Sequence, residues 1–137
     1  MTTMTATATA EAALQLRALS ASLTVDDLDR SIRFYEGIGF AIKQRWEDEG
    51  KLLGVMFKGG DAEFGISQDD FAKGKGRQKG IGFRLWATTD QDLDAIAAAA
   101  RGRGIENEGA KTESWGQRTL TFTDPDGFKL TLHNGDR

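Results

Sequence analysis

The chain has 137 residues, of which 18 are basic and 21 acidic, and a net charge of −3. This balance argues against nucleic acid as the main partner, because no positive stripe would follow its phosphates. It has no cysteine, which excludes disulfides, thiolate nucleophiles and sulfur-bound metals and favours a cytoplasmic location. The first residues lack the basic start and apolar run of a secretion signal, and no segment has the roughly 18 apolar residues of a membrane span, so we expect a single domain without a membrane partner.

Residues 1–18 are expected to form an N-terminal tail. Residues 1–8 are small and polar and have nothing to bury, so they are predicted to be disordered. A short helix is predicted from Thr9, which would cap it, with Leu14 and Leu16 available to dock on the domain.

Residues 19–70 have the pattern of one βαβββ module. Leu19 to Val25 alternate apolar and polar side chains, which predicts a strand with one buried face. Asp26 is predicted to cap the following helix, which Gly37 and Gly39 would stop. Three further strands are predicted, the last two joined by a glycine turn, at residues 40–46, 52–58 and 61–67.

Residues 71–79 are predicted to be a linker, and residues 80–137 a second βαβββ module. The linker interleaves glycine with lysine and arginine, so we expect it to be mobile, solvated and unpacked. Thr89 is predicted to cap the second helix, and the turn residues Asp124 to Gly127 divide a terminal hairpin. The strands of this module are predicted at residues 80–87, near residues 105–108, and in the hairpin at residues 118–133.

Two segments of this repeat resemble a known family. The sequences LTVDDLDRSIRFYEGIGF, residues 23–40, and DPDGFKLTL, residues 124–132, are similar to the vicinal oxygen chelate superfamily, which includes glyoxalase I, bleomycin resistance proteins and extradiol dioxygenases. The resemblance covers Leu19 to His133. It implies an α+β fold in which two βαβββ modules form a curved, incomplete mixed β-barrel around a cavity, usually in a homodimer.

The resemblance also implies where a metal would be bound. Metal-dependent members of the superfamily take their ligands, commonly two His and two carboxylates, from four strand positions that face the cavity. These positions match Ser20, Gly65, Gly80 and Thr131. Because a divalent catalytic site generally needs about three protein ligands, these residues predict that no metal cofactor is bound. A divalent metal remains the alternative.

Glu63 and His133 are the candidate catalytic residues. Each lies two positions from a matched site, Gly65 or Thr131, and therefore on the same strand face. They could form an acid and base pair or a displaced metal site in a lyase, isomerase or dioxygenase. The alternative is a structural role, with Glu63 at a rim or dimer contact and His133 partly exposed near the chain end.

Aromatic and cationic side chains on the cavity face suggest ligand binding. Tryptophan could stack a flat apolar ligand, although it is also common at sheet rims and dimer interfaces. The cations could hold a carboxylate or phosphate, or pair with Glu63. The expected ligand-binding residues are Trp46, Met56, Arg84, Trp86, Trp115 and Lys129.

These observations favour a metal-free, homodimeric protein of the glyoxalase and bleomycin resistance type that binds a small amphipathic or aromatic molecule. An enzyme of the same superfamily is the alternative. A third interpretation is a subunit that acts only through protein contacts, because one fold hosts many functions.

Overall fold

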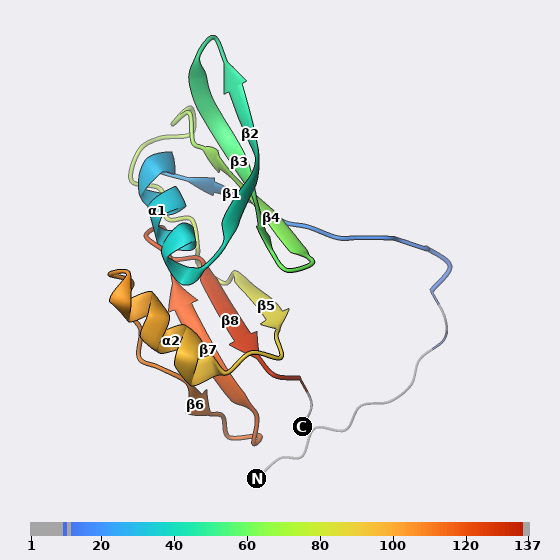
Figure 1. Ribbon diagram of the computed structural model, residues 1–137. Coiled ribbons are helices and arrows are strands. Elements are labelled where there is room, and N and C mark those ends of the chain that lie inside the picture. The colour runs from blue at the N-terminus through green and yellow to red at the C-terminus, as the bar shows by residue number, and fades with distance from the viewer. Residues whose placement is uncertain (1–9, 11, 136–137) are drawn as a thin grey trace.

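The computed structural model describes residue 10 and residues 12–135, which form two βαβββ modules (Figure 1). In chain order the elements are β1 (Ser22–Val25), α1 (Leu28–Ile38), β2 (Ala41–Asp48), β3 (Lys51–Gly59), β4 (Ala62–Gln68), β5 (Arg84–Thr88), α2 (Leu93–Gly102), β6 (Lys111–Thr112), β7 (Arg118–Thr123) and β8 (Lys129–His133). The predicted α+β fold with a repeated βαβββ unit is confirmed. Neither described helix is long and apolar enough to cross a bilayer.

Each module builds its own four-stranded mixed sheet, in the order β1-β4-β3-β2 or β5-β8-β7-β6. In both sheets the first strand pairs in parallel with the last strand of its module, and the other neighbours are antiparallel. The two sheets do not close into a barrel. Figure 1 shows α1 and α2 on the same side of the molecule and the hairpin of β2 and β3 extending away from the second module.

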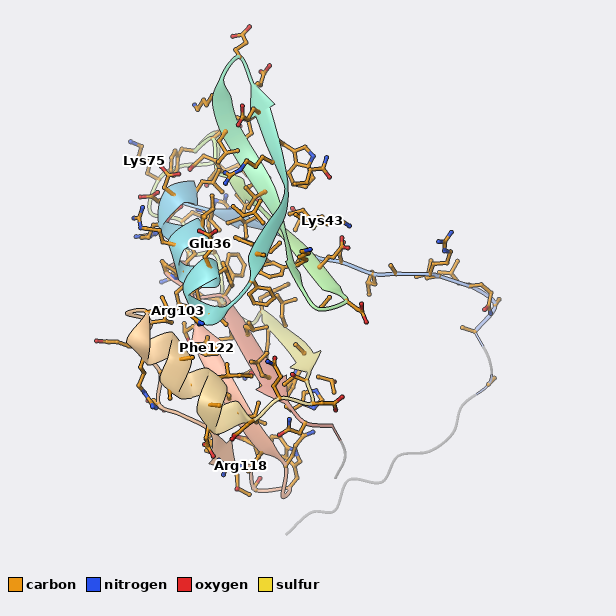
Figure 2. The ribbon with its side chains drawn as sticks, viewed as in Figure 1. Glu36, Lys43, Lys75, Arg103, Arg118 and Phe122 are labelled. Atoms are coloured by element: carbon orange, nitrogen blue, oxygen red, sulfur yellow. The ribbon has the colours of Figure 1, made fainter. Side chains whose placement is uncertain are left out.

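The predicted side-chain alternation builds the core. In β7, Leu120 and Phe122 are buried while Thr121 and Thr123 point to the opposite face, because successive strand residues alternate between faces. Phe122 lies on the side of the sheet that α2 covers (Figure 2). One apolar core cluster contains residues of both modules. The sequence pattern therefore identified correctly the face of this strand that packs against the helix.

Both predicted helix caps were wrong by one to three residues. Asp27, not Asp26, caps α1 by accepting a hydrogen bond from the backbone of Arg30 at 3.2 Å. Asp92, not Thr89, caps α2. The backbone N–H of Thr89 instead donates to the carbonyl of His133 at 2.9 Å, so the chain at Thr89 is still attached to β8 and the helix begins later. The predicted stop at Gly39 is confirmed by its C-cap position and its φ of 133°.

Two predicted strands begin later than the apolar pattern indicated. β1 begins at Ser22, and Leu19 is 89% exposed instead of buried. β5 begins at Arg84, because residues 80–83 form a turn in which the N–H of Phe83 donates to the carbonyl of Gly80. Ile81, which the pattern placed on the buried face, is 75% exposed.

The strand predicted at residues 105–108 does not form, and the short β6 follows it instead. The side chain of Asn107 forms three hydrogen bonds with the backbone around it. Its amide donates to the carbonyls of Ala97 and Ile105, and its Oδ1 accepts from the N–H of Gly109. These bonds turn the chain and leave no extended edge for pairing.

The N-terminal predictions are only partly described. Thr9 and the tail predicted to be disordered, residues 1–8, lie outside the described residues. Residues 12–18 contain no helix, and Leu14 and Leu16 are 69% and 64% exposed, so in this part the predicted docking helix was wrong. Too little apolar surface flanks these leucines to hold an isolated helix.

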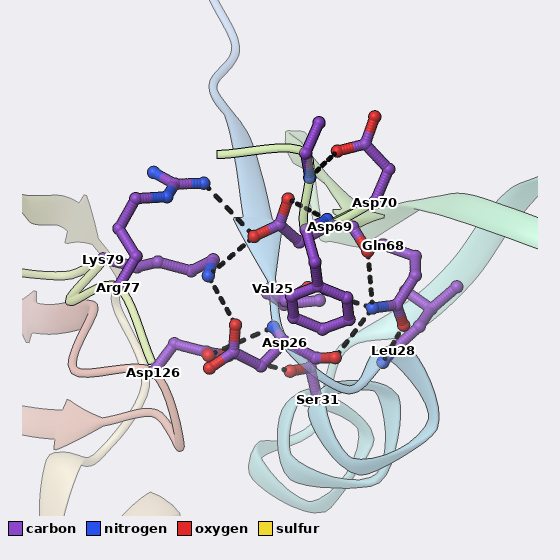
Figure 3. Close-up of polar contacts among 12 residues, drawn as sticks. Val25, Asp26, Leu28, Ser31, Gln68, Asp69, Asp70, Arg77, Lys79 and Asp126 are labelled. Carbon is purple, nitrogen blue, oxygen red and sulfur yellow. Dashed lines mark hydrogen bonds and ion pairs between the residues drawn. The ribbon is translucent and has the colours of Figure 1, made fainter. Parts of the chain in front are cut away.

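The basic linker is exposed over residues 73–78, as predicted, but its end packs against the first module, so the prediction that the linker is unpacked was wrong at Lys79. The side chain of Lys79 is only 3% exposed and lies between the carboxylates of Asp26 and Asp69, with Asp69 at 2.9 Å (Figure 3). Arg77 adds a second ion pair to Asp69 at 3.2 Å. Hydrogen bonding to Lys79 lowers the pKa of both aspartates, and the two aspartates raise the pKa of Lys79. Ion pairs of Arg77 and Lys79 therefore attach the end of the linker to the first module.

The turn between β7 and β8 joins the two modules. The hydroxyl of Tyr35 on α1 donates to the buried carboxylate of Asp124 at 2.7 Å. Asp126 accepts from the N–H of Asp26 at 3.1 Å, and burial raises the pKa of Asp126. Arg103, which Figure 2 places between the two helices, donates to the carbonyl of Gly37 at 3.2 Å. Within this chain the modules are thus joined by one buried and two partly buried polar contacts in addition to their shared apolar core.

Candidate functional site

The candidate site is an open groove of about 750 Å³ on the face of the second sheet that α2 does not cover. Cavities that hold small molecules are commonly about 300–1,000 Å³. All of its lining residues belong to the second module. They are Arg84, Trp86, Glu106, Asn107, Glu108, Gly109, Lys111, Glu113, Trp115, Thr119, Thr121, Thr123, Lys129 and Thr131. Residues of the first sheet do not contribute to this groove within the described chain.

Arg84 lines the groove from the edge strand β5, and its guanidinium is held by hydroxyl groups. Its Nη1 donates to Oγ1 of Thr131 at 2.5 Å and is 3.4 Å from Oγ1 of Thr121. The two threonine hydroxyls are 2.8 Å apart, because Thr121 and Thr131 are register partners on β7 and β8. This network orients the guanidinium without neutralising it.

Two tryptophan rings line the same groove as this cation. Trp86 and Trp115 are 54% and 55% exposed, which is high for such large apolar side chains. The guanidinium of Arg84 lies 5.6 Å from the centre of the Trp86 ring, within the range of a cation–π contact. Nε1 of Trp115 donates to Oε1 of Gln117 at 3.1 Å. The site therefore presents flat apolar surface next to positive charge.

The structure brings together four of the six ligand-binding residues predicted from the sequence: Arg84, Trp86, Trp115 and Lys129 line one groove. Trp46 and Met56 do not. They lie on β2 and β3 of the first sheet, where Trp46 is 41% exposed and Met56 pairs with Gly65. The sequence placed Arg84 and Lys129 on the cavity side of their strands, Trp46 and Trp86 at strand ends and Trp115 in a loop, but it could not show which of these residues line the same groove.

Glu63 and His133, the candidate acid and base, lie on different sheets. Glu63 forms an ion pair with Lys43 at 2.6 Å. Nδ1 of His133 is 3.0 Å from the N–H of Gly135 and 3.2 Å from the amide of Gln117. Two donors at Nδ1 make it the unprotonated nitrogen, so the lone pair that a base would use is already engaged. The two residues share no hydrogen-bond partner in the described part of the chain.

The four positions matched to metal ligands have structural roles or none. Ser20 precedes β1 and is exposed, and Gly65 pairs with Ser22 within the sheet. A Cβ at Gly80 would come within 2.0 Å of the backbone of Gly127. Thr131 is bonded to a guanidinium, which would repel a divalent cation. These donors do not fit a metal site, and no group of three or more His, Asp or Glu side chains among residue 10 and residues 12–135 is placed to hold one.

Sequence reasoning named five of the fourteen groove residues, the four above and Thr131, and missed the other nine. Thr119, Thr121 and Thr123 carried a usable signal, because they alternate with the buried residues of the hairpin and must share its other face. No sequence pattern pointed to Glu106 and Glu108, because they line the groove from an irregular loop whose course depends on the hydrogen bonds of Asn107.

The repeated βαβββ unit, the two unclosed sheets and the open groove define a two-module α+β protein of the glyoxalase-like class. The chain belongs to the Glyoxalase/Bleomycin resistance protein/Dioxygenase superfamily, whose family model matches residues 17–132. The resemblance noted in the sequence is thereby confirmed. A search of curated proteins found no match.

Solved structures share this fold. A bleomycin-binding protein complexed with bleomycin is 21% identical, with a TM-score of 0.65 over 88% of this chain and 100% of its own. A bleomycin resistance determinant encoded on the transposon Tn5 is also 21% identical, with a TM-score of 0.65 over 89% and 100%. A glyoxalase/bleomycin resistance protein from Catenulispora acidiphila is 20% identical, with a TM-score of 0.63 over 84% and 95%. At these identities the likeness establishes the fold alone.

Proposed function

We propose that this protein binds a small, flat, amphipathic molecule in the groove of the second sheet. The observation that carries the proposal is the pairing of two half-exposed tryptophans, Trp86 and Trp115, in one ligand-sized groove. Aromatic side chains left this exposed provide stacking surface that a folded protein would otherwise bury. A related fold in complex with bleomycin supports the idea that this scaffold can hold a small organic molecule.

Binding of a neutral aromatic probe tests this proposal. Phenylnaphthylamine, which becomes fluorescent in apolar surroundings, is expected to bind saturably. Replacing Trp86 or Trp115 by alanine should weaken its binding on the order of ten-fold each, because stacking and ring burial are lost. Ile81→Ala is the control, since Ile81 is exposed but does not line the groove. Absence of saturable binding up to the solubility limit of the probe, or equal effects of all three variants, would contradict the proposal.

The proposed binding needs no metal. Its support is the donor set: Ser20, Gly65, Gly80 and Thr131 offer no carboxylate or imidazole, and Arg84 places a cation against Thr131. Purified protein is therefore expected to have the same melting temperature and the same probe affinity before and after dialysis against a chelator. Stoichiometric bound metal together with a chelator-sensitive melting temperature would overturn this part of the proposal.

The homodimer expected from the family is part of the same proposal. Trp46 and Leu53 on the first sheet are 41% and 42% exposed, and exposed large apolar side chains of this kind commonly lie at protein interfaces. The molecular mass of the same samples, measured by sedimentation equilibrium, tests it.

A further inference from the structure

The charges of the groove narrow the class of ligand. Arg84 and Lys129 are register partners on neighbouring strands and both line the floor. Two positive side chains placed side by side repel each other unless an anion or solvent separates them. Their position on adjacent strands therefore creates a local positive field at this side of the groove.

Neither cation is neutralised within the described residues. Arg84 is bonded to threonine hydroxyls, and Nζ of Lys129 donates to Oγ1 of Thr123 at 3.2 Å; no carboxylate oxygen lies within ion-pair distance of either. Elsewhere the chain pairs comparable side chains, as in Arg118 with Asp94 at 2.9 Å. The two groove cations are thus held in place by neutral groups.

The carboxylates of the groove are on its other side. Glu106 and Glu108 come from the loop before β6, at the edge of the sheet opposite β5. The carboxylate of Glu113 accepts a hydrogen bond from the hydroxyl of Thr119 at 3.1 Å and forms an ion pair with Lys111 at 3.4 Å. The groove therefore has a positive side at β5 and β8 and a side at β6 where three carboxylates outnumber the single cation, Lys111. Trp86 and Trp115 line the same groove.

We infer that the ligand is an aromatic anion whose carboxylate, sulfonate or phosphate group is bound by Arg84 and Lys129 while its ring stacks on Trp86. This inference rests on the proposed function. The fork of a guanidinium matches such groups in a bidentate contact, and the hydroxyls of Thr121 and Thr131 act as positioning groups that keep the fork aimed into the groove.

Two matched probes test the charge preference. Anilinonaphthalene sulfonate has the ring system of phenylnaphthylamine and adds one sulfonate, so their difference in affinity reports the anion alone. The sulfonate is expected to bind about ten-fold more tightly, the value of one charge-assisted hydrogen bond in a partly exposed site. Arg84→Gln should remove this preference, whereas Arg45→Gln on the exposed strand β2 makes the same change of charge outside the groove and should leave it intact.

The outcomes separate this inference from the proposed function. If phenylnaphthylamine binds and Trp86→Ala weakens it, but the sulfonate binds no more tightly, the proposed function stands and the anion preference is wrong. If the preference exists but persists in Arg84→Gln, the assignment to Arg84 is wrong. If neither probe binds, both fail. Lys129→Gln gives a second measurement, with an expected loss of several-fold, and unchanged melting temperatures confirm that each variant is folded.

Discussion

Replacing Asp124 by alanine is expected to lower the free energy of unfolding by about 3 kcal/mol. The carboxylate of Asp124 is 4% exposed and accepts three hydrogen bonds, from the hydroxyl of Tyr35 at 2.7 Å and from the N–H groups of Asp126 and Phe128 at 2.9 Å each. Alanine would leave these donors without their partner in a largely buried place, and each such donor is costly. Urea denaturation followed by circular dichroism measures the loss.

Two further variants locate the effect of Asp124. Tyr35→Phe removes one of the three bonds and should cost about 1.5 kcal/mol, and adding it to Asp124→Ala should cost little more, because the two side chains act through the same contact. Asp61→Ala, at an exposed turn, is the control and should change stability by no more than about 0.5 kcal/mol. Fully additive losses, or a loss at Asp124 as small as at Asp61, would contradict a buried link between the modules.

Replacing Gly80 by alanine is expected to destabilise the protein by about 2–3 kcal/mol, the upper range for overpacking. A Cβ at this position would come within 2.0 Å of the carbonyl carbon of Gly127 and within 2.3 Å of its oxygen. Backbone atoms cannot rotate away as a side chain can, so the turn between β7 and β8 would have to move. The N–H of Gly80 also donates to the carbonyl of Asp126 at 3.1 Å, and that movement would stretch this bond.

Gly102→Ala is the matched control for Gly80→Ala. No atom lies within 4 Å of a Cβ at Gly102, which ends α2, so alanine there should be neutral or stabilising by up to about 1 kcal/mol. Thermal denaturation of both variants separates a specific clash at Gly80 from a general effect of replacing glycine. Equal melting temperatures for the two variants would show that the hairpin turn accommodates the added methyl group.

The crowding at Gly80 also bears on the family's metal positions. An imidazole or carboxylate at this position would meet the backbone of Gly127 at its first carbon atom. Glycine is therefore favoured at position 80 because the backbone there packs too closely against the turn of the hairpin to leave room for a side chain. This agrees with the proposal that the groove binds its ligand through Arg84 and tryptophan instead of through a metal.

Local sequence signals predicted most of the fold. The alternation in the hairpin placed Leu120 and Phe122 in the core, and the turn residues after Asp124 placed the reversal between β7 and β8. Strand ends and caps were less predictable. Asp26 and Asp27 are the same residue type, so the sequence could not tell which of them caps α1. In the structure Asp26 forms an ion pair with Lys79, and Asp27 is the N-cap.

The amino-acid sequence by itself determined the two βαβββ modules, the outward faces of their strands and the types of side chain available for a ligand, because these depend on residues close together in the chain. Only the tertiary structure decided that Arg84, Trp86, Trp115 and Lys129 share a groove that excludes Trp46, and that Lys79 is buried. Such outcomes depend on contacts between residues far apart in sequence, as between Tyr35 and Asp124, and periodicity carries no information about which distant segments meet.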